Sequence, residues 1–82
     1  MEKKTTYRLI FDLGEMPYLA AMYATAHAAE RLDLDIDAER TERRSGELVW
    51  VVDYAADTAE DAVAAVKAAL RSDVPLVETE EL

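Results

Sequence analysis

The topology of this chain is set by residues 33–54, which read DLDIDAERTERRSGELVWVVDY. The first half of this stretch alternates polar and apolar residues, and the second half is rich in aliphatic and aromatic residues. Alternation with a period of two is typical of a strand that has one face in water. Ser45-Gly46 lies between the two halves and is typical of a turn. The stretch therefore predicts a β-hairpin, with strands over residues 33–43 and 47–54.

The length of the hairpin loop decides which residues lie opposite each other. A three-residue loop over residues 44–46, with its glycine in the left-handed conformation, pairs Arg40 with Trp50 and keeps the apolar residues of both strands on one face. A two-residue loop pairs Glu39 with Val52 and mixes the two faces. The hydrophobic pattern therefore predicts the three-residue loop.

Outside the hairpin, β-branched and aromatic runs predict strands over about residues 5–13 and 74–79, and alanine-rich runs predict helices over about residues 17–32 and 57–72. Pro75 cannot donate a ladder hydrogen bond, so the last strand is expected at a sheet edge. Strand, helix, strand, strand, helix, strand is the order of the split βαβ motif. We therefore expect a single α+β domain over residues 1–82, in which a four-stranded antiparallel sheet carries both helices on one face.

The first predicted helix carries no charge between residues 16 and 29, in a chain of which 33% is charged. A helical wheel assigns the core stripe to Tyr18, Met22, Ala26 and Ala29, flanked by Leu19 and Tyr23. The outward face then consists of Ala20, Ala24, His27 and Arg31. Two interpretations remain: a partner-binding surface with Tyr23 and His27 at its rim, or alanine that serves only helix propensity.

A second candidate surface lies on the sheet face away from the helices. Ile10, Val49 and Val51 are expected to be neighbours on the two central strands, as an exposed apolar patch framed by charged side chains. Such a patch would suit a homodimer that packs sheet to sheet, or contact with another protein. The alternative is that these residues were used only for their β propensity.

Trp50 and Arg40 form a third candidate site, because the predicted register places them opposite each other. Arg40 would lie over the indole ring as a cation–π pair. A small-molecule pocket at this end of the core is one interpretation, and simple core filling by the tryptophan is the other. Only the first interpretation implies a function, which would be ligand binding rather than catalysis.

The acidic residues of the predicted strand over 33–43 form a ladder along one face. They are Asp33, Asp35, Asp37 and Glu39. Carboxylates on a straight strand do not converge as calcium ligands must, so no metal site is expected. The ladder instead suits an edge strand protected by charge against aggregation, or a contact surface for a basic peptide.

Composition excludes several function classes. The net charge is −9 over 82 residues, which argues against nucleic-acid binding and against adsorption to anionic membranes. Cysteine is absent, which excludes disulfides and thiol chemistry. His27 is the sole histidine, and no catalytic motif or cofactor-binding motif accompanies it. We therefore expect a soluble, cytoplasmic, non-enzymatic protein without a cofactor, whose partner is another protein or a second copy of itself.

The helical run DTAEDAVAAVKAAL at residues 57–70, the Ser-Gly turn and the absence of cysteine resemble de novo designed α/β proteins with a ferredoxin-like fold. No natural family motif matches, since cluster cysteines and an aromatic RNA-binding signature are both missing. An acidic, alanine-rich domain of a halophile would look similar, so the origin stays open. The resemblance implies a designed binder or self-associating domain, or a fold scaffold with no selected activity.

Overall fold

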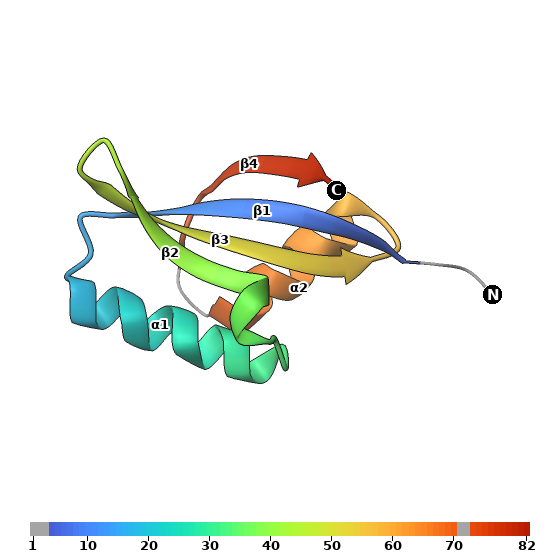
Figure 1. Ribbon diagram of the computed structural model, residues 1–82, viewed down its shortest axis with the longest axis horizontal. Helices are drawn as coiled ribbons and strands as arrows, with labels where there is room; N and C mark the ends of the chain where they lie inside the picture. The colour runs from blue at the N-terminus through green and yellow to red at the C-terminus, as the bar shows by residue number, and fades with distance from the viewer. Residues whose placement is uncertain (1–3, 71–72) are drawn as a thin grey trace.

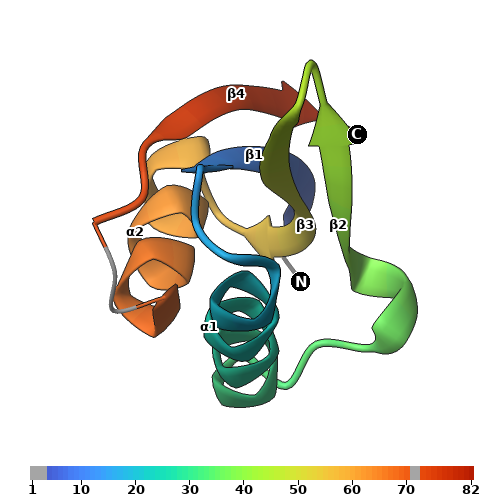
Figure 2. The ribbon, with the colours of Figure 1, turned by 90° about the vertical axis from the view of Figure 1, so that its left-hand side faces the viewer.

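The computed structural model describes residues 4–70 and 73–82. Four strands form one antiparallel sheet in the order β2-β3-β1-β4, and Figures 1 and 2 show both helices on the same side of it. The elements are β1 (Thr5–Gly14), α1 (Tyr18–Arg31), the 3₁₀ helix η1 (Ile36–Ala38), β2 (Glu39–Arg44), β3 (Glu47–Ala56), α2 (Ala59–Leu70) and β4 (Leu76–Glu81). This is the predicted α+β, ferredoxin-like arrangement.

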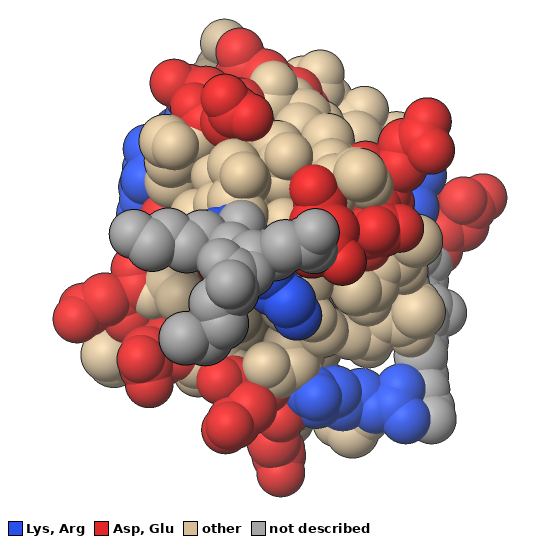
Figure 3. Space-filling model, turned by 90° about the vertical axis from the view of Figure 1, so that its right-hand side faces the viewer, with Lys and Arg blue, Asp and Glu red and all other residues tan. Residues whose placement is uncertain are grey.

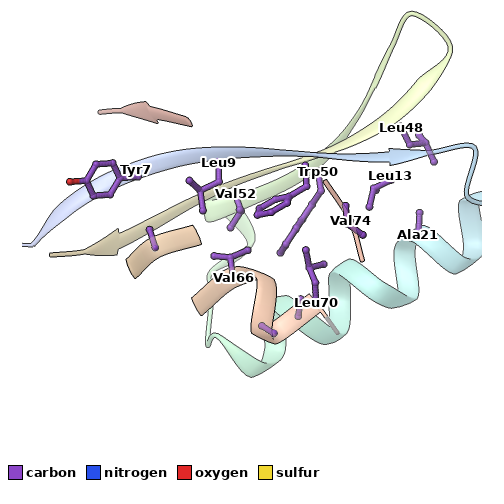
Figure 4. Packing of buried hydrophobic residues seen from close by; sticks show 14 of the residues in the cluster. Tyr7, Leu9, Leu13, Ala21, Leu48, Trp50, Val52, Val66, Leu70 and Val74 are labelled. Atoms are coloured by element: carbon purple, nitrogen blue, oxygen red, sulfur yellow. The ribbon is translucent and has the colours of Figure 1, made fainter. Parts of the chain in front are cut away.

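The main core lies between the sheet and the helices. Phe11 on β1 and Trp50 on β3 are both fully buried, and their rings lie 6.2 Å apart with a tilt of 35°. Figure 4 shows aliphatic side chains from the sheet and from α2, among them Val52 and Val66, beside the tryptophan. Two large aromatic side chains therefore occupy the centre of a small core, and they limit the space left for side chains of the helices.

The predicted strand over residues 33–43 is wrong in its first half. α1 ends in a Schellman motif, in which the N–H of Leu34 donates to the carbonyl of Ala29 (2.9 Å) and the N–H of Asp33 donates to that of Glu30 (3.1 Å). Asp33 adopts a left-handed conformation with φ 53°. Glycine usually marks this position, and an aspartate that tolerates it leaves no comparable signal in the sequence. The apolar alternation that follows belongs to the helix cap and to η1, so β2 begins only at Glu39.

The hairpin between β2 and β3 has a two-residue loop, so the predicted three-residue loop is wrong. Ser45 and Gly46 both have positive φ, at 50° and 83°, as a type I′ turn requires. The register therefore pairs Glu39 with Val52. The sequence argument against this register assumed that the residues now found in η1 belonged to the strand. Without them, β2 contains no alternating apolar residues that would favour one register, so the turn geometry determines the register.

The remaining boundaries differ from the predicted ones by a few residues. The final strand starts at Leu76 rather than at residue 74, and the carbonyl of Pro75 accepts a hydrogen bond from the N–H of Asp12 (2.9 Å) before the strand begins. β4 lies at an edge of the sheet, as the proline predicted. The described part of α2 spans Ala59–Leu70, and the last predicted residues of that helix, 71–72, lie outside the described residues.

Candidate functional site

The face that α1 turns toward the protein is not the predicted one. The buried residues of this helix are Ala21, Thr25 and Ala28. The hydroxyl of Thr25 donates to the carbonyl of Ala21 (2.9 Å), so this buried polar group is satisfied within the helix. In Figure 4 the Ala21 side chain points from α1 toward the sheet. The predicted core stripe is therefore wrong: Tyr18, Met22 and Ala26 are exposed, and Ala29 is only half-buried.

The reason for this choice of face is space rather than hydrophobicity. α1 packs chiefly against α2, and the centre of the core is already filled by Phe11 and Trp50. Small side chains let the helix approach closely, whereas tyrosine or methionine at the same positions would clash with a densely packed interior. Because residues 16–29 are uncharged on every side, a helical wheel cannot detect this constraint.

The large apolar side chains of α1 are consequently in solvent. The exposed fraction is 58% for Tyr18, 71% for Leu19, 39% for Met22 and 78% for Tyr23. Leu19, Met22, Tyr23 and Ala26 line an open hollow of about 260 Å³. We call these four residues the α1 apolar face. They follow one another at positions i, i+3, i+4 and i+7, the spacing of residues that share one side of a helix.

Carboxylates lie at both ends of the α1 apolar face. Glu15 lies in the connection before the helix, and Glu30 follows Ala26 by four residues, so that it continues the same side of the helix. Residues 15–38 carry five acidic residues and one arginine, a net charge of −4. On a different face, at the end of the molecule where β1 begins, acidic side chains outnumber basic ones (Figure 3). The segment that contains the α1 apolar face is therefore acidic, with one exposed glutamate before the face and one after it in the sequence.

The partner-binding residues predicted on α1 differ in their exposure and in the side of the helix on which they lie. Ala20, Tyr23 and His27 are exposed, and Ala24 is half-buried. Tyr23 belongs to the α1 apolar face. At 100° per residue, Ala20 and His27 lie about 60° and 40° beyond Tyr23 around the helix axis, outside that face. The sequence therefore identified the correct helix but centred the surface on its flank. Leu19 and Met22 were missed as surface residues because their size indicated a core position.

The second predicted surface is not exposed. Ile10, Val49 and Val51 do form a cluster on the outer face of the sheet, as expected, but all three are buried. The register places Arg40 beside Val51 and Glu42 beside Val49. The aliphatic parts of such long side chains can cover their apolar neighbours while the charged groups stay in water. The prediction of an exposed apolar patch on this face is therefore wrong.

Ion pairs cover much of this outer face. Arg8 donates two hydrogen bonds to the Asp53 carboxylate, at 2.8 and 3.0 Å, and this contact raises the pKa of the guanidinium. Glu42 accepts hydrogen bonds from Arg40 and Arg44, which lower the pKa of its carboxyl group. Both arrangements join neighbouring side chains on the surface of the sheet. The aliphatic cluster on the same face is buried.

The pocket predicted between Trp50 and Arg40 is contradicted by the register. Thr41, not Arg40, lies opposite Trp50, and Arg40 is on the other face of the sheet. Trp50 is fully buried, and its indole Nε1 has no hydrogen-bond partner in the described part of the chain. The tryptophan is therefore core filling, and the proposed cation–π pair is not formed.

The predicted acidic ladder is also interrupted. Its first residue, Asp33, belongs to the cap of α1, Asp37 lies in η1, and only Glu39 is in a strand. Within residues 4–70 and 73–82, no group of three acidic or histidine side chains is placed to hold a metal ion. None of the helices described is long and apolar enough to cross a membrane.

The chain was compared with known proteins at three levels. No protein family model, curated protein or solved structure matches the chain. This agrees with the absence of a natural family motif in the sequence.

Proposed function

We propose that this protein is a non-enzymatic interaction module that binds another protein through the α1 apolar face. The observation that carries the proposal is the exposure of Leu19 and Tyr23 on a helix whose small residues face the core. Exposed apolar side chains that adjoin one another, rather than lying scattered, are typical of interaction surfaces. Aromatic residues and methionine are also enriched in protein interfaces.

A domain of 82 residues has few large apolar side chains to leave outside its core. Fully burying a side chain such as leucine favours folding by about 1.5–3 kcal/mol. Tyr18, Leu19 and Tyr23 are each more than half exposed and forgo much of that contribution. Close packing explains why small residues of α1 face the core, but it does not explain why the opposite side carries leucine, methionine and tyrosine rather than charged residues. A contact with a partner does, because the same apolar surface is then removed from water on binding.

The proposal can be tested without knowing the partner, because the chain contains no cysteine. Replacing Ala26 by cysteine places a single environment-sensitive fluorophore at the α1 apolar face, and Ala64→Cys places the same fluorophore on the exposed side of α2. Peptides selected from a random helical library on the unmodified protein are then added to both labelled proteins. We expect a blue shift from the label at position 26 and none from the label at position 64.

The substitution Leu19→Ser removes an apolar side chain from the α1 apolar face without changing its charge, and it serves as the control variant. It should weaken the selected peptides by at least about tenfold and leave the circular dichroism spectrum and the free energy of unfolding unchanged. Peptides that bind Leu19→Ser as tightly as the unmodified protein would place the binding surface elsewhere. A selection that yields no peptide, together with a strictly monomeric protein, would favour a scaffold with no selected activity.

A further inference from the structure

We propose that the partner of the α1 apolar face is an amphipathic helix with basic residues flanking its apolar stripe. This inference rests on the proposed function and specifies the chemistry of the partner. Two observations support it independently: the spacing of the residues that line the hollow, and the charge that surrounds them.

The spacing favours a helix as the partner. When two helices pack side by side, a side chain of one inserts into a hole formed by four residues of the other. Leu19, Met22, Tyr23 and Ala26 have the i, i+3, i+4, i+7 spacing of such a hole, and the small Ala26 leaves it open. The hollow of about 260 Å³ therefore offers room for an apolar side chain from a facing helix.

The charge favours a basic partner. Glu15 and Glu30 lie at opposite ends of the α1 apolar face and are both exposed. The segment from residue 15 to residue 38 has a net charge of −4, within a chain of net charge −9. Lysine or arginine beside the apolar stripe of a docking helix would meet these carboxylates, raise the association rate and orient the helix.

The same charges oppose a second copy of this chain as the partner. Antiparallel pairing of two α1 helices about a two-fold axis near residues 22–23 would bring Glu15 of each copy toward Glu30 of the other. Parallel pairing would place each glutamate near its own counterpart. Either arrangement also brings together two chains of net charge −9. The carboxylates of Glu15 and Glu30 would attract the basic residues of a docking helix, whereas they would repel the same carboxylates of a second copy.

The test uses four synthetic helical peptides against the full chain, with fluorescence anisotropy as the measurement. Three peptides share one apolar stripe and carry lysine, glutamine or glutamate beside it, and the fourth keeps the lysines but has serine in the stripe. We expect the lysine peptide to bind about tenfold or more tightly than the glutamate peptide, with glutamine between them. The serine-stripe peptide should not bind, and added salt should reduce the differences.

Variants of the protein separate the contribution of charge from that of the apolar face. Glu30→Lys should weaken the lysine peptide about three- to tenfold, whereas Glu81→Lys on β4, a change of equal charge, should have a smaller effect. Tyr23→Ser should weaken the lysine and glutamine peptides alike, because it removes apolar contact and no charge. Circular dichroism confirms that each variant is folded.

Each other outcome overturns the inference in a recognisable way. The lysine, glutamine and glutamate peptides could bind equally well, and Tyr23→Ser could abolish the binding of all three. That result would remove the charge requirement and leave the proposed function intact. Binding of the serine-stripe peptide would show attraction by charge alone. If no peptide binds and light scattering shows a dimer that Leu19→Ser dissociates, the partner is a second copy. If no peptide binds and the protein stays monomeric up to about 500 µM, the proposed function fails as well.

Discussion

The two helices of this fold use their apolar residues in opposite ways. α2 buries Val66 and Leu70, and its charged residues, such as Lys67, are exposed. α1 buries two alanines and a threonine, and exposes Leu19 and Tyr23. The beginning of α2 is also capped, since the N–H of Asp61 donates to the Thr58 hydroxyl (3.1 Å), whereas no side chain caps α1 among the described residues.

This difference shows that an apolar helix need not be a core helix. In α2, hydrophobicity is confined to one side, so burial and sequence pattern agree. In α1, every side from residue 16 to residue 29 is uncharged, and the size of the side chains decides which one fits against the core. α2 therefore contributes mainly to stability, whereas the outer side of α1 is available for binding.

A leucine-to-alanine substitution in each helix should give the largest difference in the free energy of unfolding. Leu70→Ala on α2 removes a buried side chain and should lower the free energy of unfolding by about 2–5 kcal/mol. Leu19→Ala on α1 removes an exposed one and should change it by less than about 0.5 kcal/mol. Urea unfolding followed by circular dichroism measures both. A large loss for Leu19→Ala would mean that this leucine belongs to the core.

The buried side of α1 can be tested by making it larger. Ala21→Leu should overpack the region between α1 and the rest of the core and cost about 1–3 kcal/mol of stability. The neighbouring Ala20→Leu adds the same volume on an exposed position and should be close to neutral. If Ala20→Leu destabilises the protein and Ala21→Leu does not, the helix is turned differently from the structure described. Thermal unfolding of the two variants gives the comparison.

The cap of α2 should contribute less than its core residues. Thr58→Ala leaves the N–H of Asp61 without its side-chain acceptor and should lower stability by about 1 kcal/mol. Thr58→Ser keeps an acceptor oxygen and should retain most of that stability. Chemical denaturation of both variants measures the difference. Equal stability of the alanine and serine variants would show that the hydroxyl contributes nothing to the helix.

The smallest expected effect lies in the hairpin and provides a reference outside both helices. Arg40 and Arg44 lower the pKa of Glu42, so the folded protein holds this carboxylate charged at a lower pH than the unfolded chain does. The resulting stabilisation is complete above the ordinary pKa of glutamate and is lost as pH falls through the lowered value. Glu42→Gln should therefore flatten slightly the pH dependence of stability below pH 5, as urea titrations at several pH values can show. An unchanged profile would mean that the pairing is too weak in water to matter.

The predictability of this protein differs from one segment to another for identifiable reasons. The apolar runs that became β1 and β3 and the amphipathic run that became α2 were recognised with nearly correct bounds, and the order of all six predicted elements was sufficient to predict the fold class. The segment after α1 was misread because Asp33 takes a left-handed conformation in which glycine is usual. That error extended the predicted strand back to residue 33, through Ile36, which is 88% exposed in η1. The false strand then excluded the correct hairpin loop.

The candidate site was half predictable. The uncharged run on α1 identified the helix, and the wheel placed Tyr23 beside the core stripe and, in one interpretation, at the rim of a partner-binding surface. Leu19 and Met22 were assigned to the core because a large apolar side chain is usually buried. The sheet patch failed for a different reason: the long charged side chains that lie beside Val49 and Val51 cover them only when the strands are paired.

By itself, the sequence determined the order of the elements, the antiparallel sheet with two helices and the acidic character of the surface, because these depend on local periodicity and on composition. Only the tertiary structure decided which side of α1 faces the core, the register of the hairpin and the burial of the outer sheet cluster. These three features depend on how much space distant side chains such as Phe11 and Trp50 leave, and on which strands stand beside each other. No local pattern carries that information, because it arises only when the elements are packed together.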